Sequence, residues 1–576
     1  MYLNRFKFSF IFLLLFFSSF LLKDEGKTFS QNLEKIGGKD MLKVNGGLNL
    51  SSIFLNSNNP NSTRAPFSWY LNGNLTFSIL DWSIPFTYSY SNQHSTYSQP
   101  FNQYGLAPTY KWIKVYAGWS NMSFSQYTFS GYPFLGGGVE LTPNNWKIAV
   151  MYGRLKKAVE YDAINQSDRD MSFKRMGMGA KVGYENKGYG VNVIWFQAKD
   201  DVNSLTFIPE ATQIQPQENT AVSVAGKAPV TKFFNLEAEY ALSGFSRNIF
   251  ADGAPKGSKN ELPLIFKPRT TSEFYSAFKS SLTFNSKFIS CGINYERIEP
   301  GYKTLGIYYM NNDIENITLS PQFRLFKSKL NVSVNAGLQH NNLNKEKLST
   351  MRRVVGSGTI AFVPNQKWNF NASYSNFTSY SRNRPVTDPF YITSPADTMK
   401  FYQISQTANG TASHNFGNEK RRNAITLMTS YQVSRQEVGS VTGDPTTMLN
   451  GNMSYGLQFV PTKVMVSFCV NANTTKAPGM NVSYVGPGIN ICKSFFQNTM
   501  NCTFGSIYNL SNLNKVRNGS ALNERLSVTY SPKLKDKKFG KPSAGLSVNY
   551  VTRKATQANS TSLNELTINA NVSYAF

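Results

Sequence analysis

Apolar and polar residues alternate one by one along many segments, from about residue 41 to the end of the chain. The clearest alternation covers residues 82–90, 317–325, 330–338 and 566–576. In the last of these segments the apolar or aromatic positions are Leu566, Ile568, Ala570, Val572, Tyr574 and Phe576. A period of two predicts β-strands with one apolar and one mostly polar face. Such strands suit a sheet with lipid on one side and water on the other.

The segment 317–325 shows how firmly this pattern fixes the strand register. Ile317, Leu319 and Phe323 share the apolar face, whereas Arg324 belongs to the polar face. A shift by one residue would place Arg324 in lipid, at a cost of about 2–4 kcal/mol near the bilayer midplane. We therefore expect Arg324 to face water.

Twelve short groups of turn-forming residues separate the alternating segments. They are Leu80-Asp81, Lys111, Pro143-Asn144-Asn145, Asn186-Lys187-Gly188, Pro229-Val230, Asn285-Ser286-Lys287, Lys327-Ser328-Lys329, Asn365-Gln366-Lys367, Asn418 to Arg422, Pro461-Thr462-Lys463, Phe496-Gln497-Asn498 and Leu534 to Lys538. Between successive turns we expect a strand, a longer loop and a second strand. With both chain ends on the side of the turns, this arrangement gives about 26 strands.

These elements predict an all-β fold, a single transmembrane antiparallel β-barrel. The short turns would be periplasmic and the long loops extracellular. The longest expected loops are 246–269, 203–215, 381–400 and 156–171. The alternatives are a secreted β-solenoid, which no fixed repeat of 20–50 residues supports, and a multi-domain sandwich, which would not explain alternating short and long connections.

The first 30 residues have the pattern of a secretory signal peptide. Arg5 and Lys7 precede an apolar stretch from Ser9 to Leu22, which is short for a membrane-spanning helix. Cleavage before Gln31 is our interpretation, and an uncleaved anchor helix is the alternative. We assign residues 1–30 to a signal peptide and residues 31–576 to an outer-membrane β-barrel.

The expected barrel is too wide for side chains to fill. Strands about 4.8 Å apart and tilted by about 40° give a round barrel with a diameter on the order of 50 Å. Only about ten residues would precede the first strand, so we expect no plug domain. The lumen would be open, blocked by loops that fold inward, flattened, or filled by another protein.

Composition supports a wall that is apolar outside and polar inside. Charged residues make up 16% of the chain and aromatic residues 14%, against about 25% charged residues in soluble domains. The mean hydropathy is −0.33. After Lys43 no apolar run reaches the roughly 18 residues that a membrane-spanning helix needs. A helical membrane protein is therefore excluded.

The net charge of +26 indicates anionic neighbours, such as lipopolysaccharide phosphates, an acidic partner or anionic solutes. Nucleic acid does not fit, because the basic residues are dispersed and the chain carries an export signal. Candidate basic groups of the lumen or its rim are Arg324, Arg352, Arg353, Arg382 and Arg384. They could attract anions or lipopolysaccharide phosphates. Ordinary solvated charge around a polar lumen is the alternative.

Catalytic and metal-binding patterns are absent from the sequence. The three histidines are His94, His340 and His414, and nothing pairs them with a nucleophile in the manner of outer-membrane phospholipases. No His or Cys spacing matches a zinc site. We therefore predict no catalytic residues, no bound metal and no cofactor.

Three further groups of residues have structural interpretations. We expect the acidic pairs at residues 168–170 and 200–201 to be solvated loop carboxylates, with loop calcium as the alternative. Residues 136–138, three glycines in a strand, would allow a bend or a close approach in the wall. Cys492 and Cys502 flank one expected turn, and free thiols are favoured over a disulfide.

The last strand carries a second signal. Its alternation runs to Phe576, with Tyr574 two positions earlier. This ending resembles the signal that the barrel-assembly machinery reads in Gram-negative outer membranes. We therefore expect Tyr574 and Phe576 to direct assembly of the barrel.

Several phrases of the sequence occur together in a recognisable order. They are Arg64-Ala65-Pro66-Phe67, Gln99-Pro100-Phe101-Asn102, Pro108-Thr109-Tyr110-Lys111-Trp112, Met151-Tyr152-Gly153-Arg154, Tyr295-Glu296-Arg297-Ile298-Glu299-Pro300 and Asn311-Asn312-Asp313-Ile314-Glu315-Asn316. The chain thus resembles a family of large, mostly uncharacterised outer-membrane β-barrel proteins of Bacteroidota. The resemblance implies the fold and the location, and it implies no catalytic residues.

Two functions fit these observations. The first is a porin-like channel or transport component for polar solutes, anions included, that is not an enzyme. The second is a non-catalytic barrel subunit of an envelope assembly, such as a protein-secretion or surface-attachment complex. A membrane-embedded hydrolase is a third and weaker hypothesis.

Overall fold

The computed structural model describes most of the chain after residue 41. The described residues are 42–576 except 60–63, 80, 93–102, 162–170, 210–211, 213, 254–265, 347–351, 383–399, 439–440, 534–539 and 557–561. The expected signal peptide, residues 1–30, lies outside this part of the chain.

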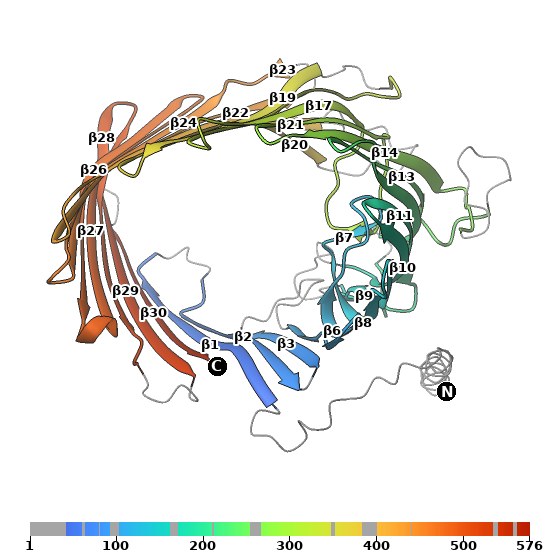
Figure 1. The fold of residues 1–576 in the computed structure, drawn as a ribbon, viewed down its shortest axis with the longest axis horizontal. Coiled ribbons are helices and arrows are strands. Elements are labelled where there is room, and N and C mark those ends of the chain that lie inside the picture. Colours follow the sequence, from blue (N-terminus) through green and yellow to red (C-terminus); the bar gives the residue numbers. More distant parts are fainter. Residues whose placement is uncertain are drawn as a thin grey trace.

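The described residues form one closed ring of strands (Figure 1). The strands of the wall are β1 Leu42–Ser57, β2 Phe67–Ile79, β3 Trp82–Ser91, β4 Gln103–Leu106, β5 Thr109–Tyr110, β6 Ile113–Asn121, β8 Pro133–Leu141, β9 Trp146–Lys156, β10 Lys174–Asn186, β11 Tyr189–Asp201, β12 Glu218–Pro229, β13 Phe234–Ser246, β14 Ser272–Asn285, β15 Ile289–Ile298, β17 Ile314–Leu325, β18 Leu330–His340, β19 Arg352–Asn365, β20 Trp368–Arg382, β21 Lys400–Gly417, β22 Arg421–Val438, β24 Thr446–Phe459, β25 Val464–Ala477, β26 Met480–Phe495, β27 Met500–Leu513, β28 Val516–Tyr530, β29 Lys541–Ala555 and β30 Leu563–Ala575. The remaining elements are β7 Phe129–Ser130, β16 Gly306–Ile307, β23 Val441–Thr442 and the short 3-10 helix η2 Phe496–Asn498.

The barrel has 26 antiparallel strands in the part of the chain that is described. The segments β4 and β5 together occupy one position between β3 and β6, and β23 only extends the end of β22. The ring closes where β1 pairs with β30, with Leu48 opposite Tyr574. Both strands at this seam thus have two neighbours, which removes the open edges of the sheet. The prediction of a single antiparallel β-barrel of about 26 strands is confirmed, and the absence of a plug domain stays a prediction.

The twelve expected turns all fall between consecutive strands, although residues 80 and 534–539 lie outside the described part. The connections at the other end of the barrel correct one expectation. Between β25 and β26, and between β27 and β28, the connection has two residues instead of a longer loop. Asn514 and Lys515 take positive φ angles of 50° and 69° in the second of these turns, as tight hairpin turns require.

The exterior carries the expected apolar face. Ile317 and Leu319 of β17 are 54% and 47% exposed, and these are lipid-facing positions, whereas Arg324 lies on the opposite face. Aromatic rings pair near the short turns: Trp82 with Tyr110, Trp146 with Tyr184, Phe234 with Phe284, and Trp368 with His414. Such a ring of aromatic residues marks a membrane interface.

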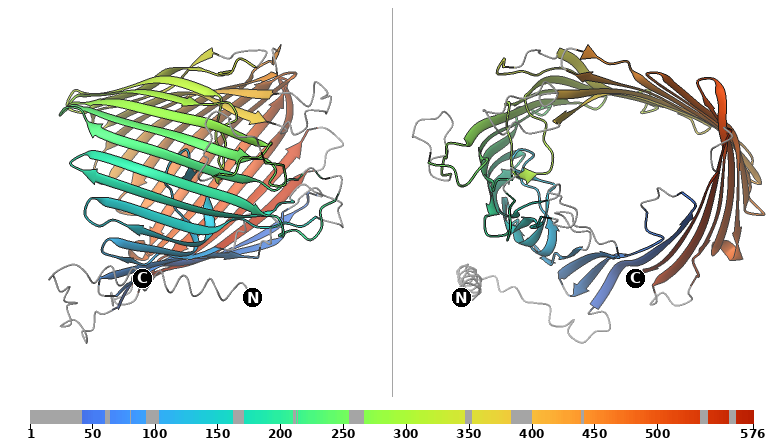
Figure 2. Two further views of the ribbon diagram at one scale, coloured as in Figure 1. Left: turned by 90° about the vertical axis from the view of Figure 1, so that its right-hand side faces the viewer. Right: turned by 180° about the vertical axis from the view of Figure 1, so that it is seen from behind.

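The strands run obliquely around the wall (Figure 2). A closed barrel with an even strand number, an apolar exterior and an aromatic girdle is the architecture of bacterial outer-membrane proteins. The protein is accordingly a multi-pass β-barrel of the cell outer membrane. Within the described residues, no helix has the length and hydropathy needed to cross a bilayer.

Candidate functional site

The lumen has two sectors of different character. In the first sector, two connections fold inward against the wall formed by β8 to β15. They are residues 122–132, between β6 and β8, and residues 299–313, between β15 and β17. We call these two connections the inner brace. Figure 1 shows its strand β7 inside the ring.

Aromatic residues anchor the inner brace to the wall. Phe129 of the brace and Phe196 of β11 have no exposed surface, and their rings stack with centroids 5.1 Å apart. Phe134, Met151 and Leu155 of β8 and β9 belong to the same apolar cluster. The brace is therefore packed like a protein core.

Hydrogen bonds join the two segments of the inner brace to each other. The Tyr302 hydroxyl donates to the Tyr127 carbonyl at 2.7 Å, and the Thr304 hydroxyl donates to the Thr128 carbonyl at 2.8 Å. The short strands β7 and β16 pair in parallel, with Gly306 opposite Phe129. Burial raises the pKa of the Tyr127 and Tyr302 hydroxyls, so both stay neutral.

Charged groups of the wall also hold the inner brace. The Tyr127 hydroxyl donates to Glu296 at 2.7 Å, Lys279 donates to the Gln126 side chain at 3.2 Å, and Ser125 bonds Glu239. Lys279, Glu239 and Glu296 of this sector therefore bond to residues of the inner brace.

Two of the three glycines of β8, Gly136 and Gly138, allow the close approach that the sequence predicts. A Cβ at Gly138 would lie 2.5 Å from the Met122 sulfur, and a Cβ at Gly136 would lie 2.1 Å from the Tyr152 carbonyl oxygen. A side chain at either position would clash, so the close approach of the brace and of β9 to the wall requires glycine.

The alternation of polar and apolar residues does not predict the inner brace, although the sequence carries a signal of it. In β11, Val191 and Val193 are more than half exposed on the lipid side, while Ile194 and Phe196 are buried on the lumen side. Apolar residues on both faces of a barrel strand mean that something covers the lumen face. The departure from alternation marks the place where the brace packs.

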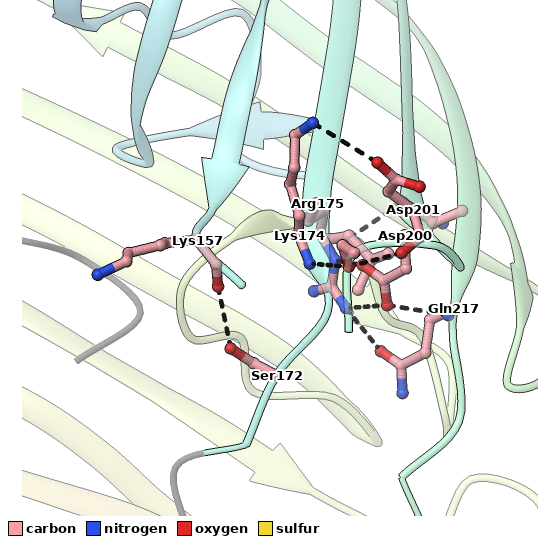
Figure 3. Close-up of polar contacts among 10 residues, drawn as sticks. Lys157, Ser172, Lys174, Arg175, Asp200, Asp201 and Gln217 are labelled. Atoms are coloured by element: carbon pink, nitrogen blue, oxygen red, sulfur yellow. Dashed lines mark hydrogen bonds and ion pairs between the residues drawn. The ribbon is translucent and has the colours of Figure 1, made fainter. Parts of the chain in front are cut away.

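Asp200 and Asp201 correct a second expectation, because they belong to the end of β11 and not to a loop. Asp200 is 3% exposed and receives two bonds from the Arg175 guanidinium, at 2.7 and 2.9 Å. Arg175 also donates to Gln217, whose backbone N–H donates to Asp200 (Figure 3). This buried ion pair fastens the start of β12 to the wall, so Asp200 is not a solvated carboxylate.

The second sector of the lumen, from β17 through β30 to β3, presents uncharged polar side chains at most positions. On β24 and β25, Asn452 donates to Asn471 at 2.5 Å, and Asn473 bonds Asn450. On β29 and β30, Ser543 bonds Ser573 at 2.6 Å. Neighbouring strands thus join their amides and hydroxyls into rows across the inner wall.

The candidate arginines are not gathered into one cluster. Arg324 is exposed on the lumen face beside the short turn that follows β17. Arg352 and Arg353 begin β19, and Arg382 ends β20, at the opposite end of the barrel. Arg384 lies outside the described residues, and the side chains of Arg352, Arg353 and Arg382 are not described. A basic lumen or rim stays a prediction.

Tyr574 and Phe576 lie at the seam that closes the barrel. The Phe576 backbone N–H donates to the Gly46 carbonyl at 2.9 Å, and the Tyr574 hydroxyl accepts from the Gly540 N–H at 2.9 Å. Their rings contact each other edge to face, with centroids 4.8 Å apart. The two aromatic residues therefore connect β30 to β1 and to the start of β29.

The described histidines and cysteines have structural surroundings. His340 pairs with Glu315 at 3.1 Å at the end of β18, and His414 stacks on Trp368 with centroids 4.0 Å apart. His94 lies outside the described residues. All four cysteines are free. Cys492 pairs with Thr503 and Lys493 with Cys502, so the two cysteine side chains of this hairpin point to opposite faces. The free thiols favoured from the sequence are thus present.

No family model and no curated protein matches the chain. Among solved structures, the P pilus usher (PapC) translocation pore is similar at 10% identity with a TM-score of 0.37, over 92% of this chain and 99% of that chain. The FrpB iron transporter from Neisseria meningitidis is similar at 10% identity with a TM-score of 0.36, over 96% and 83%. OccAB2 of Acinetobacter baumannii is similar at 8% identity with a TM-score of 0.28, over 63% and 93%. These similarities concern the fold alone.

Proposed function

We propose that the protein is a non-catalytic conduit of the outer membrane, a channel or transport component for polar solutes. The observation that carries this proposal is the uncharged polar wall from β17 to β3. Its rows of Asn, Ser and Thr offer hydrogen bonds to a solute without holding it by charge. A wall of this kind lowers the cost of removing a polar solute from bulk water.

The same wall favours uncharged solutes over the anions that net charge alone suggested. In the first sector, Lys279 donates a hydrogen bond to Gln126 of the inner brace, and Lys147 and Lys227 form ion pairs with Glu185. The conduit in this proposal has no separate plug domain, and the inner brace narrows it from one side. Residues 1–30 would serve as its signal peptide, and lipopolysaccharide would surround the loops.

Swelling of liposomes tests the proposal directly. Purified barrel reconstituted into liposomes should admit uncharged sugars, with a rate that falls as the sugar becomes larger. Heat-denatured protein in matched liposomes is the control. Liposomes that shrink and stay shrunken in every sugar, with correctly folded barrel present, would contradict a conduit.

A second candidate, a subunit of an envelope assembly, rests on exposed aromatic residues. Tyr308 and Tyr309 of the inner brace are 69% and 63% exposed, and Phe250 of the connection after β13 is 67% exposed. Large exposed aromatic side chains are frequent anchors of protein interfaces. Stable co-purification of an envelope protein, lost on replacing Tyr308 and Tyr309 by serine, would favour this candidate.

A further inference from the structure

A recess of about 500 Å³ lies on the inner wall of the second sector, where β21 to β27 pass side by side. Its volume falls within the range of about 300–1,000 Å³ that is usual for small-ligand sites. The recess is lined by six asparagines together with threonine and serine hydroxyls, and by no charged side chain. We call it the amide recess.

Two rows of side chains form the amide recess. Strand pairing places Asn409, Ser430, Asn450, Asn473 and Tyr484 in one row, and Thr411, Met428, Asn452 and Asn471 in the next. Neighbouring strands are about 4.8 Å apart, so each row offers a polar group at that interval.

A glycine at the end of the second row, Gly486 opposite Asn471, lets β27 approach closely. A Cβ at Gly486 would lie 1.9 Å from the Tyr508 carbonyl oxygen and 2.6 Å from the Asn509 side-chain oxygen. Any larger residue would push β27 away. The backbone of β27 can thus approach, and Asn509 reaches the recess.

The absence of charge distinguishes the amide recess from the other described recesses of the barrel. One of these contains Lys279 and Glu296, another contains Lys227 and Glu239, and a third contains Lys367 and Arg422. An ionic ligand would find no opposite charge in the amide recess and would lose part of its hydration there. An uncharged ligand with many hydrogen-bonding groups would not.

We infer that the amide recess binds an uncharged oligosaccharide. Each asparagine side chain both donates and accepts hydrogen bonds, which matches the hydroxyl groups of a sugar. Tyr484 and Met428, 42% and 50% exposed, add apolar surface on which the C–H face of a sugar ring can pack. The small volume favours a short sugar chain over a polypeptide. The inference rests on the proposed function and names the solute class of that conduit.

Saturation-transfer NMR on the purified barrel in detergent tests the inference with maltotriose as the probe. This experiment measures binding and not conduction. A negative result would therefore contradict the inference without contradicting the proposed conduit, and a failed swelling assay would contradict the conduit without contradicting binding. We expect saturation transfer from protein to sugar. The double substitution Asn452→Leu with Asn471→Leu should weaken binding by about tenfold or more, because several hydrogen bonds are lost. Tyr484→Ala should reduce transfer to the ring C–H protons.

The matched control is Asn549→Leu, which makes the same change on the lumen face of β29, outside the recess. Heat-modifiable migration in gels verifies that each variant folds. If the double variant does not fold, Tyr484→Ala alone tests the site. Absence of transfer to maltotriose at millimolar concentration would overturn the inference. Equal binding by all variants would overturn the site, and preferential binding of an uncharged Gly-Ser peptide would assign the recess to polypeptide instead.

Discussion

At the scale of single residues, the burial of Phe129 is a feature that the sequence pattern does not predict. Phe129 lies in a connection between two strands, and by position it should be solvent-exposed, yet none of its surface is exposed. Its partners Phe134 and Phe196 come from other strands of the wall. Spacing along the chain carries no information about such contacts, which explains why the inner brace was missed. The apolar inner faces of β9 and β11 are local traces of it, because Met151 and Phe196 are buried on the lumen side of strands whose outer face is apolar as well.

Removal of the Phe129 ring should loosen the inner brace. Phe129→Ala leaves a cavity in a packed cluster, a change that typically costs about 3–5 kcal/mol. We expect a lower temperature for loss of the compact, heat-modifiable form in gels. Phe250→Ala, which removes an exposed ring, is the control and should leave that temperature unchanged. Equal shifts in the two variants would show that the brace does not stabilise the barrel.

Lys303 of the inner brace should make barrel stability depend on pH. Its ammonium lies 4.4 Å from the centre of the Phe245 ring. Burial, together with the charges of Arg175 and Arg247, lowers the pKa of Lys303 to about 8, against about 10.4 in an unfolded chain. Between these two values the unfolded chain holds more protons, so stability should rise as pH rises.

The measurement for Lys303 is the unfolding temperature of the barrel at pH 7 and at pH 10. We expect the wild type to gain stability over this range relative to Lys303→Met. Part of the Lys303 side chain stays in contact with water while its ammonium lies over the Phe245 ring, so the difference in stability should be modest. Parallel pH profiles of the two proteins would show that Lys303 does not titrate in this way.

At the scale of elements, alternation and turn residues predicted the wall of the barrel well. Lys187 and Lys463 take positive φ angles in expected turns, and the period of two fixed which face of β17 meets lipid. The two-residue turns at Gly479 and Asn514 were not predicted, because we expected every short connection to be followed by a long one. Turn residues show that a connection exists but not which side of the membrane it occupies.

The two faces of β24 should respond oppositely to a new charge. Met453 is 57% exposed on the lipid face, whereas Ser454 next to it faces the lumen. Met453→Arg should destabilise the barrel by about 2–4 kcal/mol near the bilayer midplane, and Ser454→Arg should have little effect. Urea unfolding in phospholipid vesicles measures both. A reversed order would mean that the register of this strand is wrong.

The seam between β1 and β30 should limit assembly. Replacing Tyr574 and Phe576 together by alanine removes the ring contact and the hydroxyl that accepts from Gly540. We expect less heat-modifiable barrel in the outer membrane of producing cells. Tyr550→Ala on the exterior of β29 controls for loss of an aromatic residue. A normal amount of folded barrel in the double variant would argue against a role of these residues in assembly.

At the scale of the whole molecule, net charge does not tell how charge is distributed around the lumen. The chain carries a net charge of +26, whereas the described second sector of the lumen is lined mainly by Asn, Ser and Thr. The sequence contained the information needed for this distinction, because the polar positions of each alternating strand are the lumen positions. A net charge summed over the entire chain does not show which strand positions carry the charged residues.

Conductance in planar bilayers tests the central claim, a wide conduit with an uncharged polar wall. Pure protein should give steady conductance that rises with salt concentration, and a salt gradient should produce only a small reversal potential because neither ion is preferred. A membrane that stays silent with folded barrel inserted would contradict the conduit. Strong selectivity for anions or for cations would contradict the uncharged wall.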